Sequence, residues 1–317
     1  MKKTLIALAA VAATGAAFAQ SSVTLYGRVD ASVGQSKDTV TNVSTTQVFN
    51  GGAGGLTGSR WGMRGSEDLG GGLKAVFNLE NRFNLDTGTT GGGFLGNAYI
   101  GLTGGFGTVH VGRSYNAYDY TQDLSVFDNA LDSSFTADFN AGNTTRSANM
   151  IKYVSPTFSG FTAVASTGLG EGTAKNQNGL SLGYAAGPLA VRVGGQSAAN
   201  GDAVGVSAGY DLGVASVSGG YNQLSAPNNG NDSMGYTMGV TVPMGAFKFS
   251  AGFAIGEVET NAGAKVSDTT GFGLAASYSL SKRTTAYVGY NDSKLENAAG
   301  VKTAGSRLYA VGVRHDF

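Results

Sequence analysis

The chain closes with the stretch Tyr309-Ala310-Val311-Gly312-Val313-Arg314-His315-Asp316-Phe317. Side chains of a β-strand alternate between two faces, so the odd-numbered residues here form a mostly apolar stripe and the even-numbered ones a small or polar face. The last residues of a soluble domain usually fray, whereas this stretch ends on a large apolar side chain. The pattern favours a strand whose outer face meets lipid and whose inner face meets water.

The same alternation recurs along the whole chain. The segments are about 8–12 residues long, the length that a tilted strand needs to cross a bilayer. The clearest of them are Val23–Val33, Leu73–Phe83, Val204–Tyr210, Met234–Val242, Phe247–Ile255, Phe272–Leu280, Ala286–Tyr290 and Tyr309–Phe317. Strands alone are also compatible with a soluble β-sandwich or β-helix, because an apolar face can pack against a second sheet as well as against lipid.

The connections between these segments are alternately tight and long, which favours the barrel. Seven tight turns are rich in Gly, Pro, Asp and Ser, and eight longer polar connections include Ser36–Gly58, Asn222–Ser233 and Ser293–Gly305. Short turns at one end and longer loops at the other are typical of an outer-membrane barrel. We therefore predict an all-β transmembrane antiparallel barrel of about sixteen strands, whose first and last strands pair to remove the open edge.

The first residues predict export. A basic start at Lys2 and Lys3, an apolar stretch from Thr4 to Ala13 and the small-residue site Ala17-Phe18-Ala19 occur in the order of a secretory signal peptide. We expect residues 1–19 to be cleaved and residues 20–317 to form the barrel.

Composition excludes several classes of protein. The chain has no apolar run of about 18 residues, which excludes a helical membrane protein. It has no cysteine and therefore neither disulfides nor thiolate metal sites, and its formal net charge of zero argues against a nucleic-acid binder. Charged residues make up only 13% of the sequence, while 52 glycines and 30 tyrosine and phenylalanine residues suit a barrel with small inner side chains.

Charged side chains gather on the inward-facing positions of the early strands. Parity places them opposite apolar residues such as Leu25, Trp61 and Phe77, which take the outer face. These inward positions hold Arg28, Asp30, Arg60, Arg64, Lys74, Glu80 and Arg82. Arg113 ends a later strand but shares the register of Val109 and Val111, so a local bend is needed to turn it inward.

An unusually long connection follows Arg113 and lasts until about Ala148. A loop of this length is uncommon and usually functional. It carries the carboxylates of Asp119, Asp123 and Asp128 and has no basic residue before Arg146. Folded inward, it would hold carboxylates across a narrow aqueous gap from the arginines, and the resulting transverse field would act on permeating solutes.

Several short motifs occur in an order that resembles the general diffusion porins of Gram-negative outer membranes, in particular those of betaproteobacteria. The motifs are Leu25-Tyr26-Gly27-Arg28, Ser59-Arg60-Trp61-Gly62-Met63-Arg64-Gly65-Ser66-Glu67-Asp68-Leu69-Gly70, Val111-Gly112-Arg113, Tyr153-Val154-Ser155-Pro156-Thr157-Phe158-Ser159-Gly160 and the final Phe317. The resemblance spans the mature chain, and the combined order is more specific than any single motif.

The resemblance implies a homotrimer that sits in outer-membrane lipid and lipopolysaccharide, with a third extracellular loop folded into the pore. It implies that the barrel assembly machinery reads Tyr309 and Phe317 as an assembly signal. By position, Arg28, Arg60 and Arg113 match the family's basic pore wall, with Arg82 and Arg146 as additions. The long loop lacks the Pro-Glu-Phe-Gly motif of the enterobacterial porins. The resemblance therefore does not decide which of its aspartates lies at the narrowest point of the pore.

The expected function is passive diffusion of ions and small hydrophilic solutes through the bacterial outer membrane, without cofactor or metal. A substrate-specific channel and an adhesin-type barrel are the alternatives. An outer-membrane hydrolase is less favoured, because the only histidines, His110 and His315, are not accompanied by a nucleophile motif. The sequence does not decide between anion and cation preference, since inward arginines and loop aspartates act in opposite directions.

Overall fold

The computed structural model describes residues 22–51, 54–122, 146–172, 174–227 and 230–317. No helix in these ranges is both long and apolar enough to cross a membrane. The described part consists of strands and one short 3₁₀ helix, with these bounds: β1 Ser22–Asp38, β2 Ser44–Phe49, β3 Arg60–Gly70, β4 Leu73–Arg82, β5 Ala98–Gly104, β6 Gly107–Tyr115, η1 Tyr118–Gln122, β7 Arg146–Val154, β8 Phe161–Gly168, β9 Gln177–Ala186, β10 Leu189–Ala198, β11 Gly201–Asp211, β12 Ser216–Ser225, β13 Asn231–Met244, β14 Phe247–Thr260, β15 Lys265–Ser279, β16 Thr284–Asn297 and β17 Lys302–Asp316.

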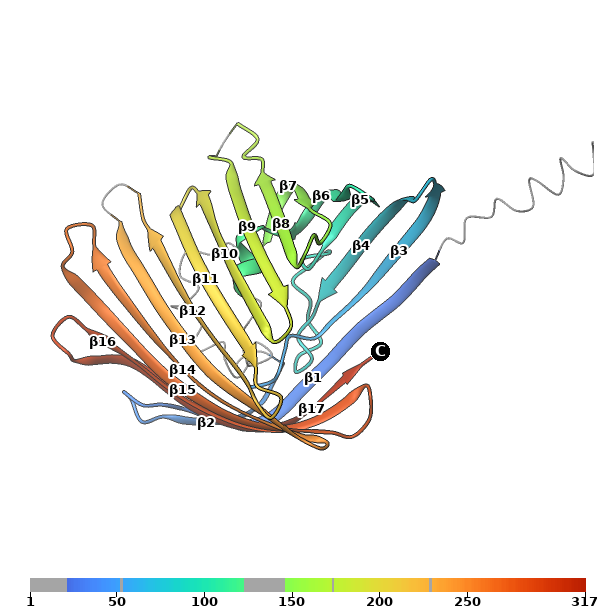
Figure 1. Ribbon diagram of the computed structural model, residues 1–317. Helices are drawn as coiled ribbons and strands as arrows, with labels where there is room; N and C mark the ends of the chain where they lie inside the picture. The colour runs from blue at the N-terminus through green and yellow to red at the C-terminus, as the bar shows by residue number, and fades with distance from the viewer. Residues whose placement is uncertain (1–21, 52–53, 123–145, 173, 228–229) are drawn as a thin grey trace, which may run out of the picture.

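The strands form a single closed antiparallel barrel (Figure 1). From β3 onward each strand pairs with the next one in sequence, and β17 returns to pair with β1 from Arg28 opposite Asp316 to Asp38 opposite Ser306. Beyond the last ladder pair, Gly27 and Phe317 exchange two backbone hydrogen bonds of 3.0 Å. Closure satisfies the backbone of both outermost strands, as the sequence analysis predicted.

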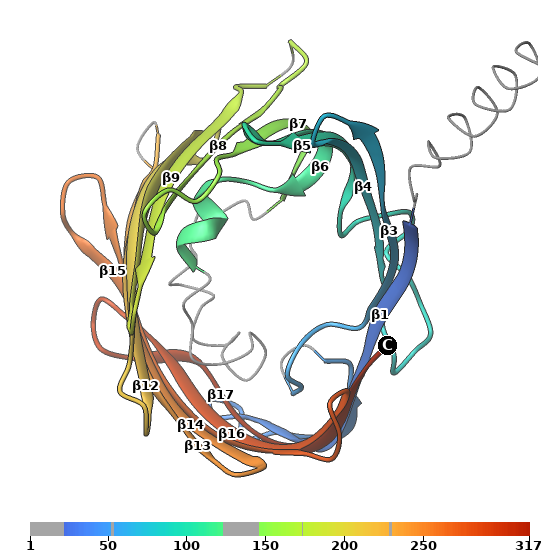
Figure 2. The same cartoon turned by 45° about the vertical axis from the view of Figure 1, so that its right-hand side comes forward.

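Strands β2 and β3 share one position in the barrel wall. The first pairs with residues 32–37 of β1 and the second with residues 22–28 of the same strand. The wall therefore has sixteen positions, which confirms the expected strand number. Between β2 and β3 the chain leaves the wall, and the described residues 54–59 lie inside the ring of strands (Figure 2).

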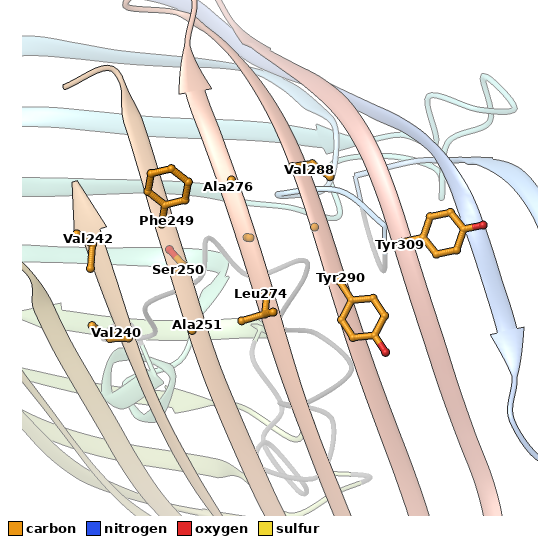
Figure 3. A pocket seen from close by; sticks show the side chains of 12 residues that line it. Val240, Val242, Phe249, Ser250, Ala251, Leu274, Ala276, Val288, Tyr290 and Tyr309 are labelled. Atoms are coloured by element: carbon orange, nitrogen blue, oxygen red, sulfur yellow. The ribbon is translucent and has the colours of Figure 1, made fainter. Parts of the chain in front are cut away.

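The outer surface of the barrel is apolar. On β17, Tyr309, Val311 and Val313 are each about half exposed, whereas Ala310 on the opposite face is buried. A hollow of about 490 Å³ opens on this outer surface over β13–β17 and is lined by side chains such as Phe249, Leu274 and Tyr309 (Figure 3). Its position and apolar lining make it part of the lipid-facing belt, not part of the lumen.

Several strands continue where the sequence predicted long loops. Only residues 226–230 separate β12 from β13, and only residues 298–301 separate β16 from β17, so the expected loops Asn222–Ser233 and Ser293–Gly305 are mostly strand. Ser36–Gly58 likewise contains the end of β1 and all of β2. Strand pairing needs only backbone hydrogen bonds, so the strands continue beyond the bilayer. Their outer ends carry no apolar stripe, and the sequence pattern therefore did not predict them.

The closing seam is locked by a side chain that crosses it. Tyr287 of β16 passes over Gly312 of β17, and its hydroxyl donates a hydrogen bond to Oδ1 of Asp30 on β1. A Cβ at residue 312 would collide with the Tyr287 hydroxyl and with the Ala31 carbonyl oxygen. Gly312 is therefore needed because a ring occupies the space of its missing side chain.

Candidate functional site

Three arginines form a lateral row on the inner wall. Arg28 of β1 lies directly opposite Arg60 of β3, and Arg60 lies directly opposite Arg82 of β4. Directly opposed like charges destabilise a sheet, since their Cβ atoms lie only about 5 Å apart. Such a row persists only where nearby carboxylates or water compensate it.

Two carboxylates compensate the row in part. Arg28 forms an ion pair with Asp316, its partner across the closing seam. Glu80 is 5% exposed; its Oε1 lies 3.3 Å from Nη2 of Arg82, and its Oε2 lies 4.0 Å from Nη1 of Arg60. Parity placed Glu80 on the inner face together with Arg60 and Arg82, and the register of the neighbouring strands brings these charges into contact.

Tyr115, at the end of β6, extends the cationic surface to the next strands. Its hydroxyl accepts a 3.4 Å hydrogen bond from Nη2 of Arg82, and its ring lies 3.6 Å from the guanidinium carbon of Arg146. Its carbonyl oxygen accepts a 2.9 Å hydrogen bond from Nζ of Lys152 on β7. Stacking on an aromatic face holds a guanidinium in place without neutralising it.

Arg314 adds a cation on the other side of the row. It lies opposite Asp30 in the β1–β17 ladder, and its Nε lies 3.4 Å from Oδ2 of Asp316. The arginine row and the charged groups around it, from β17 to β7, thus form a cluster of six cations and three carboxylates in the described part of the chain. The cations are Arg28, Arg60, Arg82, Arg146, Lys152 and Arg314, and the carboxylates are Asp30, Glu80 and Asp316.

The start of the long connection lies against the far wall. Asn116 Nδ2 donates to Gln196 Oε1 at 3.1 Å, the Ala117 amide donates to Ser166 Oγ at 2.8 Å, and the Tyr118 hydroxyl donates to the Val204 carbonyl oxygen at 3.0 Å. These contacts fix η1 to the inner faces of β8, β10 and β11. Figure 2 shows η1 inside the ring of strands.

Glycines on the far wall give η1 room to approach. A Cβ at Gly205 would lie 2.8 Å from the Tyr118 hydroxyl, and one at Gly183 would lie 2.9 Å from the Tyr120 ring. Burial raises the pKa of Tyr118 to about 12, so its hydroxyl stays a donor throughout the physiological range. Arg192 of β10 donates from Nη1 to the Tyr120 carbonyl oxygen at 3.2 Å and lies 4.3 Å from the Tyr120 ring centre.

The remaining residues singled out from the sequence are scattered. Arg64 lies on β3 beyond Arg60 in the direction of the tight turn, 5.1 Å from the Tyr26 ring centre, and Lys74 is exposed near the same turn. Asp119 lies in η1, within electrostatic range of Arg146. Asp123 and Asp128 lie outside the described residues.

Two of the expected lumen charges are placed differently. Arg113 lies opposite Ala98, in the outward register of Ile100, and its Nε donates to the Leu95 carbonyl oxygen at 3.1 Å. The β6–β7 ladder does shift between Gly112 and Ser114, but the β5–β6 ladder stays in register and keeps Arg113 out of the row. Asp30 is fully buried and serves as a hydrogen-bond acceptor for neighbouring chain segments, so it does not line the water-filled space.

Lys152, Arg192, Arg314 and Tyr115 are not among the pore residues predicted from the sequence. Parity alone carries a signal for Arg192, which sits between Val191 and Val193, and for Arg314, which sits between Val313 and His315. The parts played by Lys152 and Tyr115 depend on contacts between strands, which a single sequence does not contain.

His110 is the one histidine on the inner wall. Its ring stacks on Tyr99 at 4.2 Å between ring centres, and its Nε2 lies 2.8 Å from Ser114 Oγ. Both partners of this pair are buried, and Ser114 also contacts Met150. The pair therefore packs within the barrel wall.

Comparisons with known proteins agree with this architecture. The family model "Gram-negative porin" matches residues 4–298. The chain is 33% identical to outer membrane porin protein 32 of Delftia acidovorans, over 99% of this chain and 95% of that protein. It is 30% identical to an outer membrane porin protein of Bordetella pertussis over the full length of both.

Solved structures show the same likeness. The anion-selective porin from Comamonas acidovorans superposes with a TM-score of 0.78 and 28% identity, covering 94% of this chain and all of that one. A closed sixteen-position barrel, an apolar outer belt and a charged inner wall are what an outer-membrane diffusion channel requires. The chain therefore belongs to the Gram-negative porin family of outer-membrane diffusion channels.

Proposed function

We propose that the arginine row of β1, β3 and β4 and the η1 segment opposite it bound the narrow section of the channel, and that this section prefers anions. The observation that carries the proposal is the direct register of Arg28, Arg60 and Arg82 on three neighbouring strands. Guanidinium groups keep their charge at every physiological pH. A cluster of six cations and three carboxylates on the inner wall therefore attracts anions at any such pH.

The electrostatic asymmetry of the lumen supports this preference. Asp30 is buried beneath the surface and Glu80 lies between two arginines, so two of the three carboxylates in this cluster are shielded from the lumen. On the far wall, the charge of Arg192 balances that of Asp119 in η1. The porin from Comamonas acidovorans, a structural relative of this chain, is described as anion-selective, in line with the proposal.

The route to the membrane forms part of the proposal. Residues 1–19 act as a cleaved signal peptide, and the aromatic stripe with Tyr309 and Phe317 serves as the signal for the barrel assembly machinery. Three copies assemble in outer-membrane lipid and lipopolysaccharide. The family membership and the mutual hydrogen bonds of Phe317 with Gly27 support this view of the chain's end.

Purified protein in planar bilayers tests the channel function. We expect stepwise, ohmic conductance that grows with salt concentration and that small neutral sugars reduce in proportion to the volume they exclude. Sugars too large for the narrow section are expected to leave the conductance unchanged, which gives the size limit. An adhesin-type barrel with a closed lumen would insert and pass no current, and a substrate-specific channel would be blocked by one sugar at low concentration.

A further inference from the structure

Residues 54–59 form a second segment that folds onto the inner wall. Asp30, which has no exposed surface, holds it from β1. Oδ2 of Asp30 accepts hydrogen bonds from the backbone amides of Leu56 at 3.0 Å and Thr57 at 2.8 Å, while Oδ1 accepts the hydroxyl of Tyr287. One carboxylate thus joins three parts of the chain that are far apart in sequence.

Further bonds from β1 fix both ends of this inner segment. Ser32 Oγ donates to the Gly54 carbonyl oxygen at 2.6 Å, and the backbone amide of Asp30 donates to Ser59 Oγ at 3.0 Å. A Cβ at Gly55 would lie 2.5 Å from the Gly51 Cα, 2.9 Å from Oδ1 of Asp30 and 3.0 Å from the Tyr287 hydroxyl. The segment therefore fits closely over the Asp30–Tyr287 pair, and this position has no room for a larger residue.

An apolar cluster on the inner face also needs this cover. Phe49, Leu308 and Ala310 are each less than 9% exposed, although they lie on the lumen side of β2 and β17. Leu56 of the inner segment packs against them, together with Ala275. Apolar side chains on a water-filled wall are otherwise unfavourable, so the segment is retained inside the barrel by burial as well as by hydrogen bonds.

The inner segment lies across the lumen from η1. It is anchored on β1 and β16–β17, whereas η1 is anchored on β8–β11. In the closed order of strands, β10 is eight of the sixteen positions away from β1. Figure 2 shows η1 and residues 54–59 inside the ring on different sides.

The inner segment also contacts the arginine row. Nη2 of Arg60 donates to Thr57 Oγ1 at 2.6 Å, and its Nε donates to the Gly58 carbonyl oxygen at 3.3 Å. The conformation of residues 54–59 therefore fixes where the central guanidinium of the row projects.

We propose that residues 54–59 are a second pore-narrowing element, latched by Asp30 and Tyr287, which limits the width of the channel opposite η1 and positions Arg60. The inference rests on the proposed channel function and deepens it. Asp30 and Tyr287 act as positioning residues, since they act on permeating solutes only through the segment they hold.

Tyr287→Phe tests the latch, because it removes the hydroxyl and keeps the ring over Gly312. Tyr290→Phe is the matched control, since Tyr290 lies on the same strand but on the outer face. The chain has no cysteine, so Thr57→Cys can report the exposure of the segment through its labelling rate with a water-soluble thiol reagent. Each tyrosine variant is combined with Thr57→Cys for labelling and measured alone for conductance.

We expect Thr57→Cys to be labelled about fivefold faster in the Tyr287→Phe background than in the control. Loss of one buried hydrogen bond increases the population in which the segment is released from the wall by about this factor. We also expect higher single-channel conductance and passage of larger neutral sugars. Equal labelling and equal conductance of the two variants would overturn the inference while leaving the channel function intact. Absence of conductance in the unmodified protein would instead refute the channel function. If Tyr287→Phe does not fold, Gly55→Ala displaces the segment itself, because its Cβ meets the Gly51 Cα and the Asp30–Tyr287 pair. Its labelling rate and conductance are compared with those of Gly105→Ala, whose added Cβ meets no atom within 4 Å, and equal values would overturn the inference.

Discussion

Replacing Arg28, Arg60 and Arg82 together by glutamine is expected to abolish anion preference and leave the channel nonselective or weakly cation-selective. Within the cluster, the substitution leaves three cations, Arg146, Lys152 and Arg314, against the carboxylates of Asp30, Glu80 and Asp316. At an effective dielectric constant of about 20, a unit charge acts on an ion about 10 Å away with about 1.7 kcal/mol. Water and salt in the lumen weaken this figure, so we expect the anion-to-cation permeability ratio to fall about tenfold.

The reversal potential in a salt gradient measures this change. Lys175→Gln with Lys265→Gln is the control, because it removes two exposed positive charges, one just before β9 and one at the start of β15, away from the row. The single variant Arg82→Gln should give an intermediate shift, since it removes one charge and leaves Glu80 with Arg60. A reversal potential that is the same in the triple variant and the control would contradict the assignment of the row.

Substituting Gly312 by valine is expected to give the largest loss of stability. The new side chain occupies the space of the Tyr287 ring and meets the Ala31 carbonyl oxygen, so the ring must leave and its hydrogen bond to Asp30 is lost. Overpacking costs about 1–3 kcal/mol, and a buried acceptor left without its donor costs about 1–3 kcal/mol more. We expect a loss of about 3 kcal/mol or more in the free energy of unfolding, because both effects act at the closing seam.

Denaturant unfolding of the barrel in detergent or lipid measures this loss. Gly105→Val is the matched control, because Gly105 lies at a tight turn with open space around it and without a positive φ. An unfolding midpoint for Gly312→Val within experimental error of the control would show that the seam tolerates the added side chain. The role assigned to the Tyr287 crossing would then be wrong.

Much of the barrel could be predicted from the sequence, because apolar and polar side chains alternate along each strand. One face of the strand meets lipid and the other meets water. The odd-numbered apolar residues of the last strand and the even-numbered inner residues of the first strand follow the predicted parity. The boundaries of the longer strands could not be predicted. Beyond the lipid both faces meet water, so strands such as β13 and β17 continue without an apolar stripe.

The inner wall was predictable in part. Parity assigned Arg28, Arg60 and Arg82 to the inner face, but their direct register depends on how neighbouring strands align, and pairing register is set by turns and contacts outside each strand. The same limit explains Asp30. Its inward parity was clear, yet the three groups that bury it come from residues 56, 57 and 287, and only the closed barrel brings them together.

Arg113 shows where parity and resemblance disagree. Parity favoured the outward face, whereas position in the family pattern favoured the pore wall. The structure keeps the outward register against Ala98 and turns the guanidinium to the Leu95 carbonyl oxygen. Arg146 and Lys152, brought together by Tyr115, supply cations near this place.

The reversal potential of the unmodified protein in a planar bilayer, across a gradient of potassium chloride, tests the central claim most directly. The excess of cations in the cluster from β17 to β7 predicts a current and a reversal potential of the sign that chloride flux produces. A reversal potential of the opposite sign, or a bilayer that contains the protein and passes no current, would contradict it.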